Sequence, residues 1–213
     1  MARDGKATKE RILNNAEALI FEHGLSGTSI DMIIERTGVT KGAFFYHFKS
    51  KGELARELVE TASANDMALM RNSLERAEKL SSDPLQQVLI CIGLIREIIE
   101  SLDAPPPGCL FASMNYQRLE VPFDMAETAQ CTFLTWRKGL GDKLAAAQKL
   151  HIPDSTFDPY DLADNFSTMF EGALVMYRLF NDASFLTKSM DFYRDLVSGY
   201  FGTLTDAPAR KAE

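Results

Sequence analysis

The chain has 213 residues, of which 46% are hydrophobic and 25% charged, enough to bury one large hydrophobic core or two small ones. Its net charge is −7, but residues 1–51 carry eight Lys and Arg against six Asp and Glu, whereas residues 52–213 carry 15 against 24. No apolar run approaches the roughly 18 residues of a membrane span, and no apolar segment follows the basic start, which argues against a membrane or secreted protein. We therefore expect a cytoplasmic protein whose residues 1–51 have a net positive charge and whose residues 52–213 have a net negative charge.

Three helices are predicted at the N-terminal end of the chain. The first covers residues 8–22 and stops at Gly24, because glycine is favoured just past a helix end. The second begins at Thr28 and ends at Gly38, and the third covers residues 40–48. The short turn at Gly38 places the second and third helices next to each other, as in a helix-turn-helix.

The rest of the chain is predicted to be helical as well. Apolar residues recur at helical spacing, and no stretch alternates between apolar and polar residues as a strand would. The sequence therefore predicts an all-α protein of about nine helices. Beyond the first three, these helices cover approximately residues 52–79, 84–102, 109–119, 121–150, 160–180 and 185–204.

Residues 28–51 have the layout of a helix-turn-helix, whose second helix fits the major groove of DNA. Small or polar residues at the start of that helix let the backbone approach the base edges, and Phe44 and Phe48 supply an apolar underside. Each feature alone also fits a helical hairpin with a solvated basic edge, but their combination favours DNA. The predicted DNA-binding residues are Thr28, Ser29, Thr40, Lys41, Gly42, Ala43, Tyr46, His47 and Lys51.

This segment resembles the TetR-type (tetracycline-repressor-like) family of transcriptional regulators, over about residues 8–56. The resemblance implies a homodimer that binds a near-palindromic operator in double-stranded DNA, usually as a repressor, and is released by a small molecule. It divides the chain into a helix-turn-helix domain, residues 1–51, and a helical regulatory and dimerisation domain, residues 52–213. The matching residues are His23-Gly24, Thr28-Ser29-Ile30, Glu35-Arg36, Gly38-Val39-Thr40-Lys41-Gly42 and Phe44-Phe45-Tyr46-His47-Phe48-Lys49-Ser50-Lys51.

Three residues depart from the family pattern. Phe45 stands where many members carry a tyrosine whose hydroxyl meets a phosphate, so that contact is expected to be absent. Asp31 stands where arginine is frequent, and its spacing from Thr28 favours a capping box over a base contact. Ile34 replaces a frequent alanine where the two short helices cross, which widens or shifts that crossing. We therefore do not expect this protein to recognise the same operator sequence as a relative.

Aromatic and methionine residues are frequent in the second domain. They suit either core packing or an apolar cavity for a drug-sized ligand. The last two predicted helices carry aromatic and small residues at helical spacing, and two such helices from each subunit would form a four-helix bundle in a homodimer. The predicted ligand-binding residues are Phe111, Met114, Tyr116, Phe133, Trp136, Met169, Phe170 and Tyr177.

Other functions receive less support from the sequence. Cys109 follows Pro107-Gly108 at a predicted helix start, where a lowered thiol pKa would suit a sensor of electrophiles or oxidants; a small buried residue is the other interpretation. A DNA-binding protein without a ligand is a further alternative. The three histidines are scattered, and we find no metal-ligand spacing, nucleophile motif or phosphate loop, so we expect no enzyme activity, metal or cofactor.

Overall fold

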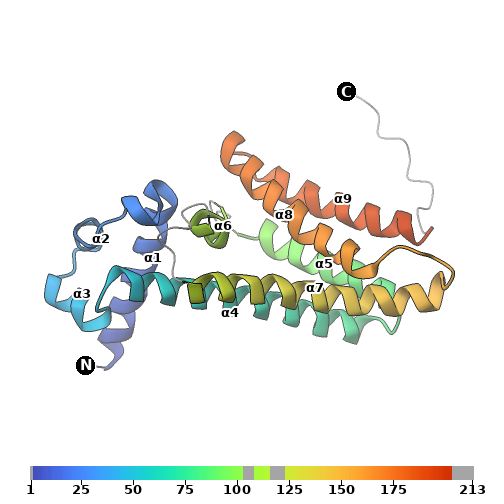
Figure 1. Cartoon of the computed structure of the whole chain (residues 1–213), viewed down its shortest axis with the longest axis horizontal. Helices are drawn as coiled ribbons and strands as arrows, with labels where there is room; N and C mark the ends of the chain where they lie inside the picture. The colour runs from blue at the N-terminus through green and yellow to red at the C-terminus, as the bar shows by residue number, and fades with distance from the viewer. Residues whose placement is uncertain (1, 103–107, 116–122, 203–213) are drawn as a thin grey trace. The chain divides into compact units, whose positions relative to one another are not determined.

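The computed structural model describes residues 2–102, 108–115 and 123–202 (Figure 1). Within these ranges all regular structure is helical, which confirms the all-α prediction. No helix there is both long and apolar enough to cross a membrane. The helices are α1 (Ala2–Gly27), α2 (Ile30–Thr37), α3 (Lys41–His47), α4 (Lys51–Leu80), α5 (Pro84–Glu100), α6 (Leu110–Asn115), α7 (Phe123–His151), α8 (Pro159–Phe180) and α9 (Ser184–Tyr200).

The described residues pack as two compact units. One unit is drawn from residues 1–66 and 106–132, and the other from residues 67–105 and 133–213. This division follows packing alone, and the functional division after residue 51 stays a prediction.

Local sequence signals explain how the first helices end. α1 is interrupted at Gly24, whose backbone has φ 75° and ψ 166°, so the predicted stop is present although the helix resumes to Gly27. The N-cap of α2 is Ser29, whose hydroxyl accepts a hydrogen bond from the Met32 N–H at 3.1 Å. The prediction that Thr28 begins this helix in a capping box with Asp31 is therefore wrong. The Thr28 hydroxyl instead donates to the Gly24 carbonyl, at 2.8 Å.

The turn and the third helix match the sequence prediction. Gly38 ends α2 in the left-handed region, with φ 66° and ψ 16°, where glycine carries no Cβ penalty. Thr40 caps α3 by accepting a hydrogen bond from the Ala43 N–H, at 3.1 Å. Phe48 follows the last residue of α3, so the observed helix occupies the predicted range.

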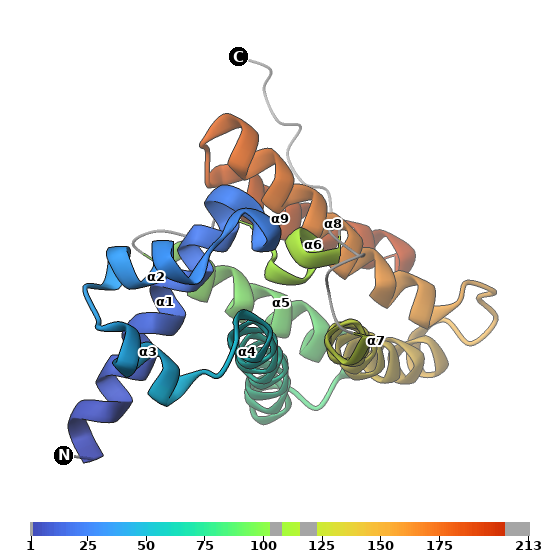
Figure 2. The same cartoon turned by 60° about the vertical axis from the view of Figure 1, so that its left-hand side comes forward.

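An apolar core holds α1 to α4 together within the first unit. The helical spacing of its residues turns one face of each helix inward. α1 and α2 pack against each other, and α1 also contacts the end of α3 through the Lys9 ammonium, 5.6 Å from the centre of the Phe48 ring (Figure 2). The core residues include Ile12, Ala16, Leu19, Ile20, Ile33, Phe44, Phe48, Leu54 and Ala55.

The second unit is built on α9, which packs against both α5 and α8. Tyr193 on α9 is 1% exposed, and its hydroxyl donates to the Leu162 carbonyl at 3.0 Å. Burial raises the pKa of the Tyr193 phenol, so it stays a neutral donor. Asp83 and Asp158 cap α5 and α8, and each precedes a proline at the first helical position.

Tyr160 at the start of α8 packs directly on α7. Its hydroxyl donates to the Asp142 carboxylate at 2.7 Å, and this hydrogen bond raises the pKa of Tyr160. Hydrogen bonds from Lys138 and Tyr160 lower the pKa of Asp142. The Tyr160 ring lies over Gly141, where an added Cβ would overlap the ring. Gly141 therefore permits this close contact between the two helices.

We expect Gly141→Ala to displace Tyr160 and destabilise the second unit. The control is Gly93→Ala in α5, where an added Cβ meets no atom within 4 Å. Relative to that control, overpacking is expected to lower the free energy of unfolding by about 1–3 kcal/mol. Urea unfolding followed by circular dichroism measures the difference, and equal stability of the two variants would contradict this packing.

Candidate nucleic-acid interface

The helix-turn-helix places one face of α3 outward and holds the other face in the core. Phe44 and Phe48 are both 0% exposed, and their ring centres lie 5.9 Å apart. Ile33 of α2 is equally buried. Because the underside of α3 is fixed in this way, the helix presents its remaining side chains to solvent in a defined orientation.

The predicted base-contacting and phosphate-contacting residues of α3 lie mainly on the outward face. Thr40, Lys41 and Gly42 are exposed at its start, and Ala43 is half-buried. Tyr46 is 78% exposed near its end, and its ring meets the half-buried His47 ring edge-on with centres 5.0 Å apart. A surface of this kind can donate hydrogen bonds to base edges and phosphates.

The two predicted residues at the start of α2 are placed differently. Ser29 is exposed, but its hydroxyl is already the N-cap acceptor for Met32. Thr28 is 1% exposed and hydrogen-bonded to Gly24, so its side chain has no surface to offer a phosphate. The sequence alone does not show which of these two neighbouring residues is exposed, because the hydroxyl of either one could cap the helix.

The Lys51 side chain links two helices within the first unit. Its ammonium donates to the Leu25 carbonyl at 2.9 Å, which links the start of α4 to the end of α1. The Arg36 guanidinium meets both carboxylate oxygens of Glu22 at 2.8 Å and links α2 to α1. These contacts set the position of the helix-turn-helix, a function that the sequence did not predict for Lys51.

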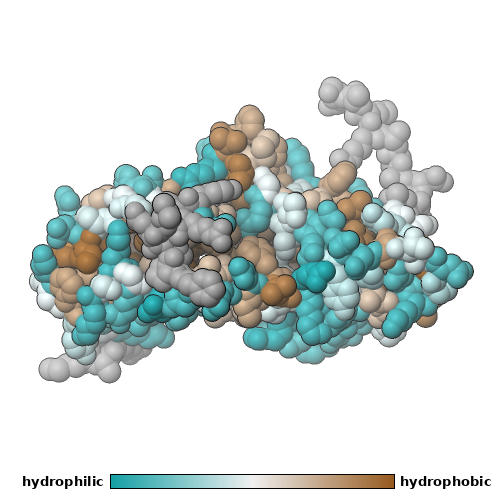
Figure 3. All heavy atoms as spheres, in the orientation of Figure 1, coloured by the Kyte–Doolittle hydropathy of each residue, from teal (hydrophilic) through white to brown (hydrophobic). Residues whose placement is uncertain are grey.

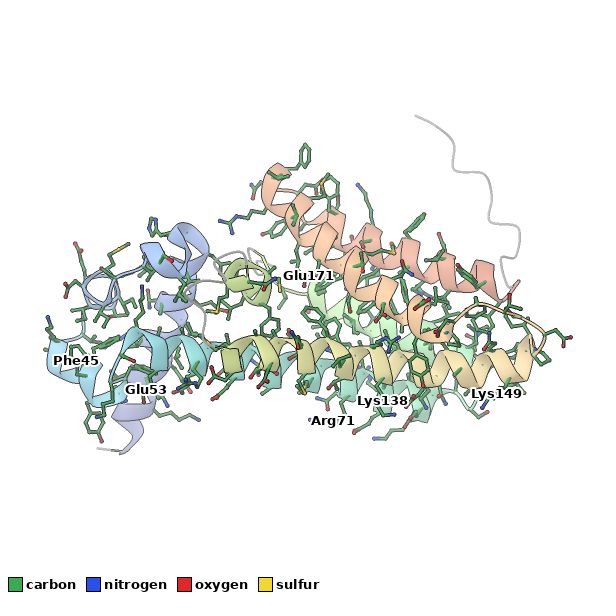
Figure 4. All side chains as sticks on the ribbon, viewed as in Figure 1. Phe45, Glu53, Arg71, Lys138, Lys149 and Glu171 are labelled. Atoms are coloured by element: carbon green, nitrogen blue, oxygen red, sulfur yellow. The ribbon has the colours of Figure 1, made fainter. Side chains whose placement is uncertain are left out.

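The residues that depart from the family pattern also lie on or beside this surface. Phe45 is 37% exposed on α3, with its ring edge-on to Phe44 at 5.4 Å between centres (Figure 4). Ile34 is half-buried on α2. The Asp31 carboxylate lies 3.8 Å from the Lys41 ammonium, and their side chains are 84% and 70% exposed. Asp31 therefore adds a negative charge next to a predicted base contact.

Some of the predicted ligand-binding residues form an aromatic cluster in the second unit. The Trp136 ring lies 6.4 Å from Phe133 and 6.4 Å from Phe170, and 5.6 Å from Phe166, which the prediction omitted. Trp136 is 5% exposed and Tyr177 is half-buried.

The other predicted ligand-binding residues lie elsewhere. Phe111 and Met114 are buried on α6 in the first unit, and Tyr116 lies outside the described residues. Met169 lines an open groove of about 640 Å³ between α8 and α9. The sequence did not indicate the α9 side of this groove, although Phe185 and Phe192 recur there on one helix face. Its lining residues are Met169, Ala173, Phe185, Lys188, Ser189, Asp191, Phe192 and Asp195.

The three cysteines occupy different environments. Cys109 is half-buried, and its sulfur accepts a hydrogen bond from the Ala112 N–H at 3.4 Å, so it contributes to the start of α6. Burial raises the pKa of the Cys91 thiol to about 12, which keeps it protonated. Cys131 is exposed on α7. A sensing function of Cys109 stays a prediction.

Comparisons with known proteins place this arrangement in a family. Residues 12–58 match the model of a family described as bacterial regulatory proteins, tetR family. The chain is 33% identical over 147 residues to the probable HTH-type transcriptional regulator ArpR of Pseudomonas putida, covering 68% of this chain and 67% of that protein. It is 29% identical over 128 residues to the HTH-type transcriptional regulator AcrR of Shigella flexneri, covering 60% of this chain but only 57% of that protein.

Solved structures share the same fold. A TetR-family transcriptional regulator from Agrobacterium tumefaciens superposes with a TM-score of 0.71 and 22% identity, covering 90% of this chain and 98% of that one. A TetR transcriptional regulator from Chloroflexus aurantiacus gives a TM-score of 0.70 and 21% identity, covering 92% and 96%. The family match, the ArpR relative and the helix-turn-helix geometry agree, and the chain belongs to the TetR family of DNA-binding transcriptional regulators.

Proposed function

We propose that the protein is a repressor that binds a near-palindromic operator as a homodimer and is released by a small apolar or amphipathic effector. The observation that carries this proposal is the division of α3 into a buried underside and an exposed polar face. Phe44 and Phe48 hold the helix, while Lys41 and Tyr46 project from it. This division is what a recognition helix in a major groove needs.

The contacts with DNA divide into two kinds. Thr40, Lys41, Gly42 and Ala43 open α3, where side chains and backbone can reach base edges. We assign phosphate contacts to Tyr46, His47 and Ser29. The Lys51 ammonium has further N–H donors for a phosphate besides the one that it gives to the Leu25 carbonyl. For Thr28 we propose a structural function only, because it is buried.

The homodimer is proposed to form through α8 and α9. Leu179 and Phe180 near the end of α8 are 71% and 63% exposed, and Phe192 on α9 is 63% exposed. Figure 3 shows apolar surface where α8 meets α9. Phe166 and Leu174 on α8 are buried within the subunit and are not part of this proposed interface. Large exposed apolar side chains that gather on neighbouring helices favour an interface with a second subunit.

Release by the effector is proposed to follow a population shift. An effector that binds better to one dimer conformation stabilises it, and in that conformation the two recognition helices are no longer about 34 Å apart, the spacing of successive major grooves. The aromatic cluster of Phe133, Trp136 and Phe170 is our candidate for the effector site, with Tyr177 on the same helix as Phe170. Aromatic walls of this kind suit an apolar or amphipathic molecule.

Two exposed residues of α3 give the cleanest test. We expect Tyr46→Ala to weaken binding to operator and random DNA alike, because a phosphate contact carries no sequence information. Lys41→Ala is expected to weaken operator binding by about 1–3 kcal/mol more than random binding, because it removes a base contact. Fluorescence anisotropy on both DNAs, with salt titrations, measures the two effects.

The matched control is Lys149→Ala, an exposed lysine on α7 of the second unit (Figure 4). It removes the same charge as Lys41→Ala and is expected to leave sequence preference unchanged. Thr40→Ala and Lys51→Ala are less informative, because they also remove the α3 cap and the hydrogen bond to Leu25. Equal behaviour of the Tyr46, Lys41 and Lys149 variants on both DNAs would contradict the assigned functions.

A further inference from the structure

Asp31 and Lys41 bring opposite charges together at the starts of the two helices of the helix-turn-helix. Asp31 is the second residue of α2 and Lys41 the first residue of α3. The Lys41 Nζ and the Asp31 Oδ1 lie 3.8 Å apart, and both side chains are more than two-thirds exposed. The pair therefore offers one hydrogen-bond donor and one acceptor side by side on the predicted DNA-binding surface.

The helix dipole favours a carboxylate in the first turn of α2, where Asp31 lies, but it does not require that carboxylate to pair with Lys41. The N-cap of α2 is Ser29, so Asp31 is not needed to close the helix end by a side-chain hydrogen bond. An ion pair exposed to this degree contributes little to stability, because solvent screens it. An unpaired carboxylate facing DNA would be repelled by the phosphates, whereas a carboxylate beside a lysine is neutralised. The pair can therefore enter a groove where Asp31 alone could not.

We propose that Asp31 and Lys41 together read one G·C base pair in each half of the operator, an inference that rests on the proposed function of α3. Lysine donates to O6 and N7 of guanine, and aspartate accepts from the N4 amine of cytosine. O6 and N4 are hydrogen-bonded to each other within the base pair, so they lie about 2.9 Å apart. The spacing of 3.8 Å between Nζ and Oδ1 lets each group face one of these atoms.

An A·T pair fits the same two groups less well. It also presents a donor, N6 of adenine, beside an acceptor, O4 of thymine. The ammonium of Lys41, however, finds a single acceptor there with the thymine methyl group next to it, whereas guanine offers two acceptors on one base. Both groups therefore contribute to the preference for G·C. Replacing guanine by adenine takes the O6 acceptor away from Lys41, and it places the O4 acceptor of thymine where Asp31 requires the N4 amine of cytosine.

The test measures the affinity of the full-length protein for its selected operator and for duplexes with each base pair replaced in turn. We expect one position in each half-site where replacing G·C by A·T weakens binding about 5- to 150-fold. Asp31→Ala is expected to reduce the penalty at that position by about 5-fold or more and to leave the other positions unchanged. Glu35→Ala, the removal of another exposed acid on α2, is expected to keep the penalty.

The outcomes separate this proposal from the function on which it rests. A penalty profile that is identical for the wild-type protein and the Asp31→Ala variant, or a wild-type profile with no G·C requirement, would overturn the proposal while leaving operator binding intact. Failure of the wild-type protein to prefer any sequence would overturn the proposed function as well. Thermal unfolding of the Asp31→Ala variant checks that it is folded, which its exposed position leads us to expect.

Discussion

Phe44→Ala is expected to destabilise the helix-turn-helix by about 3–5 kcal/mol and to abolish DNA binding. Phe44 is 0% exposed and lies against the rings of Phe48 and Phe45. Its removal leaves a cavity under α3, and the outward face of α3 loses its fixed orientation. Since a domain is typically stable by only about 5–15 kcal/mol, a loss of this size removes a large share of the total.

The neighbouring residue supplies a matched control. Phe45→Ala deletes the same side chain one position along α3, but Phe45 is 37% exposed, so it leaves a smaller cavity. Urea unfolding followed by circular dichroism gives the two stabilities, and fluorescence anisotropy gives the DNA affinities. Equal losses of stability in the two variants would contradict the division of α3 into a buried and an exposed face.

The double substitution Leu179→Asp and Phe192→Asp is expected to convert the proposed dimer into monomers. Both residues are more than 60% exposed on the last two helices, so the two carboxylates should not disturb the subunit itself. In the dimer they would be buried without partners, which is costly for a charged group. Because the dimer holds two half-sites at once, we expect operator affinity to fall by about 100-fold or more.

Sedimentation velocity measures the oligomeric state of this variant. The control is Leu134→Asp, which introduces a carboxylate at an apolar side chain of α7 that is 59% exposed. It is expected to leave the sedimentation coefficient unchanged. Monomers from Leu134→Asp, or dimers from the double variant, would contradict an interface formed by α8 and α9.

The helices could be predicted closely where their ends carry local signals. Thr40 and Gly38 mark the start of α3 and the end of α2, and both ends lie where the sequence predicts them. The N-cap of α2 is Ser29 rather than its neighbour Thr28, which the sequence predicts, because both residues offer a hydroxyl. The Thr28 hydroxyl donates a hydrogen bond to the Gly24 carbonyl instead of capping α2. This contact depends on the backbone conformation at Gly24, which the sequence does not show.

The candidate effector site was harder to predict for a physical reason. Helical spacing shows which residues of one helix are apolar together, but not which neighbouring helix they meet. The sequence therefore assigns Phe111 and Trp136 to one predicted ligand site, although the two residues belong to different compact units. The same limit applies to α8, where Leu174 is buried and Leu179 exposed despite equal hydrophobicity.

In the proposed repressor, two copies of α3, held in one dimer, bind two half-sites of an operator. Selection of duplexes from a random DNA pool by the purified protein tests this arrangement. We predict enrichment of an inverted repeat whose half-site centres lie about 10 base pairs apart, or a multiple of that spacing. Enrichment of a single unrepeated half-site, or of no sequence, would contradict it.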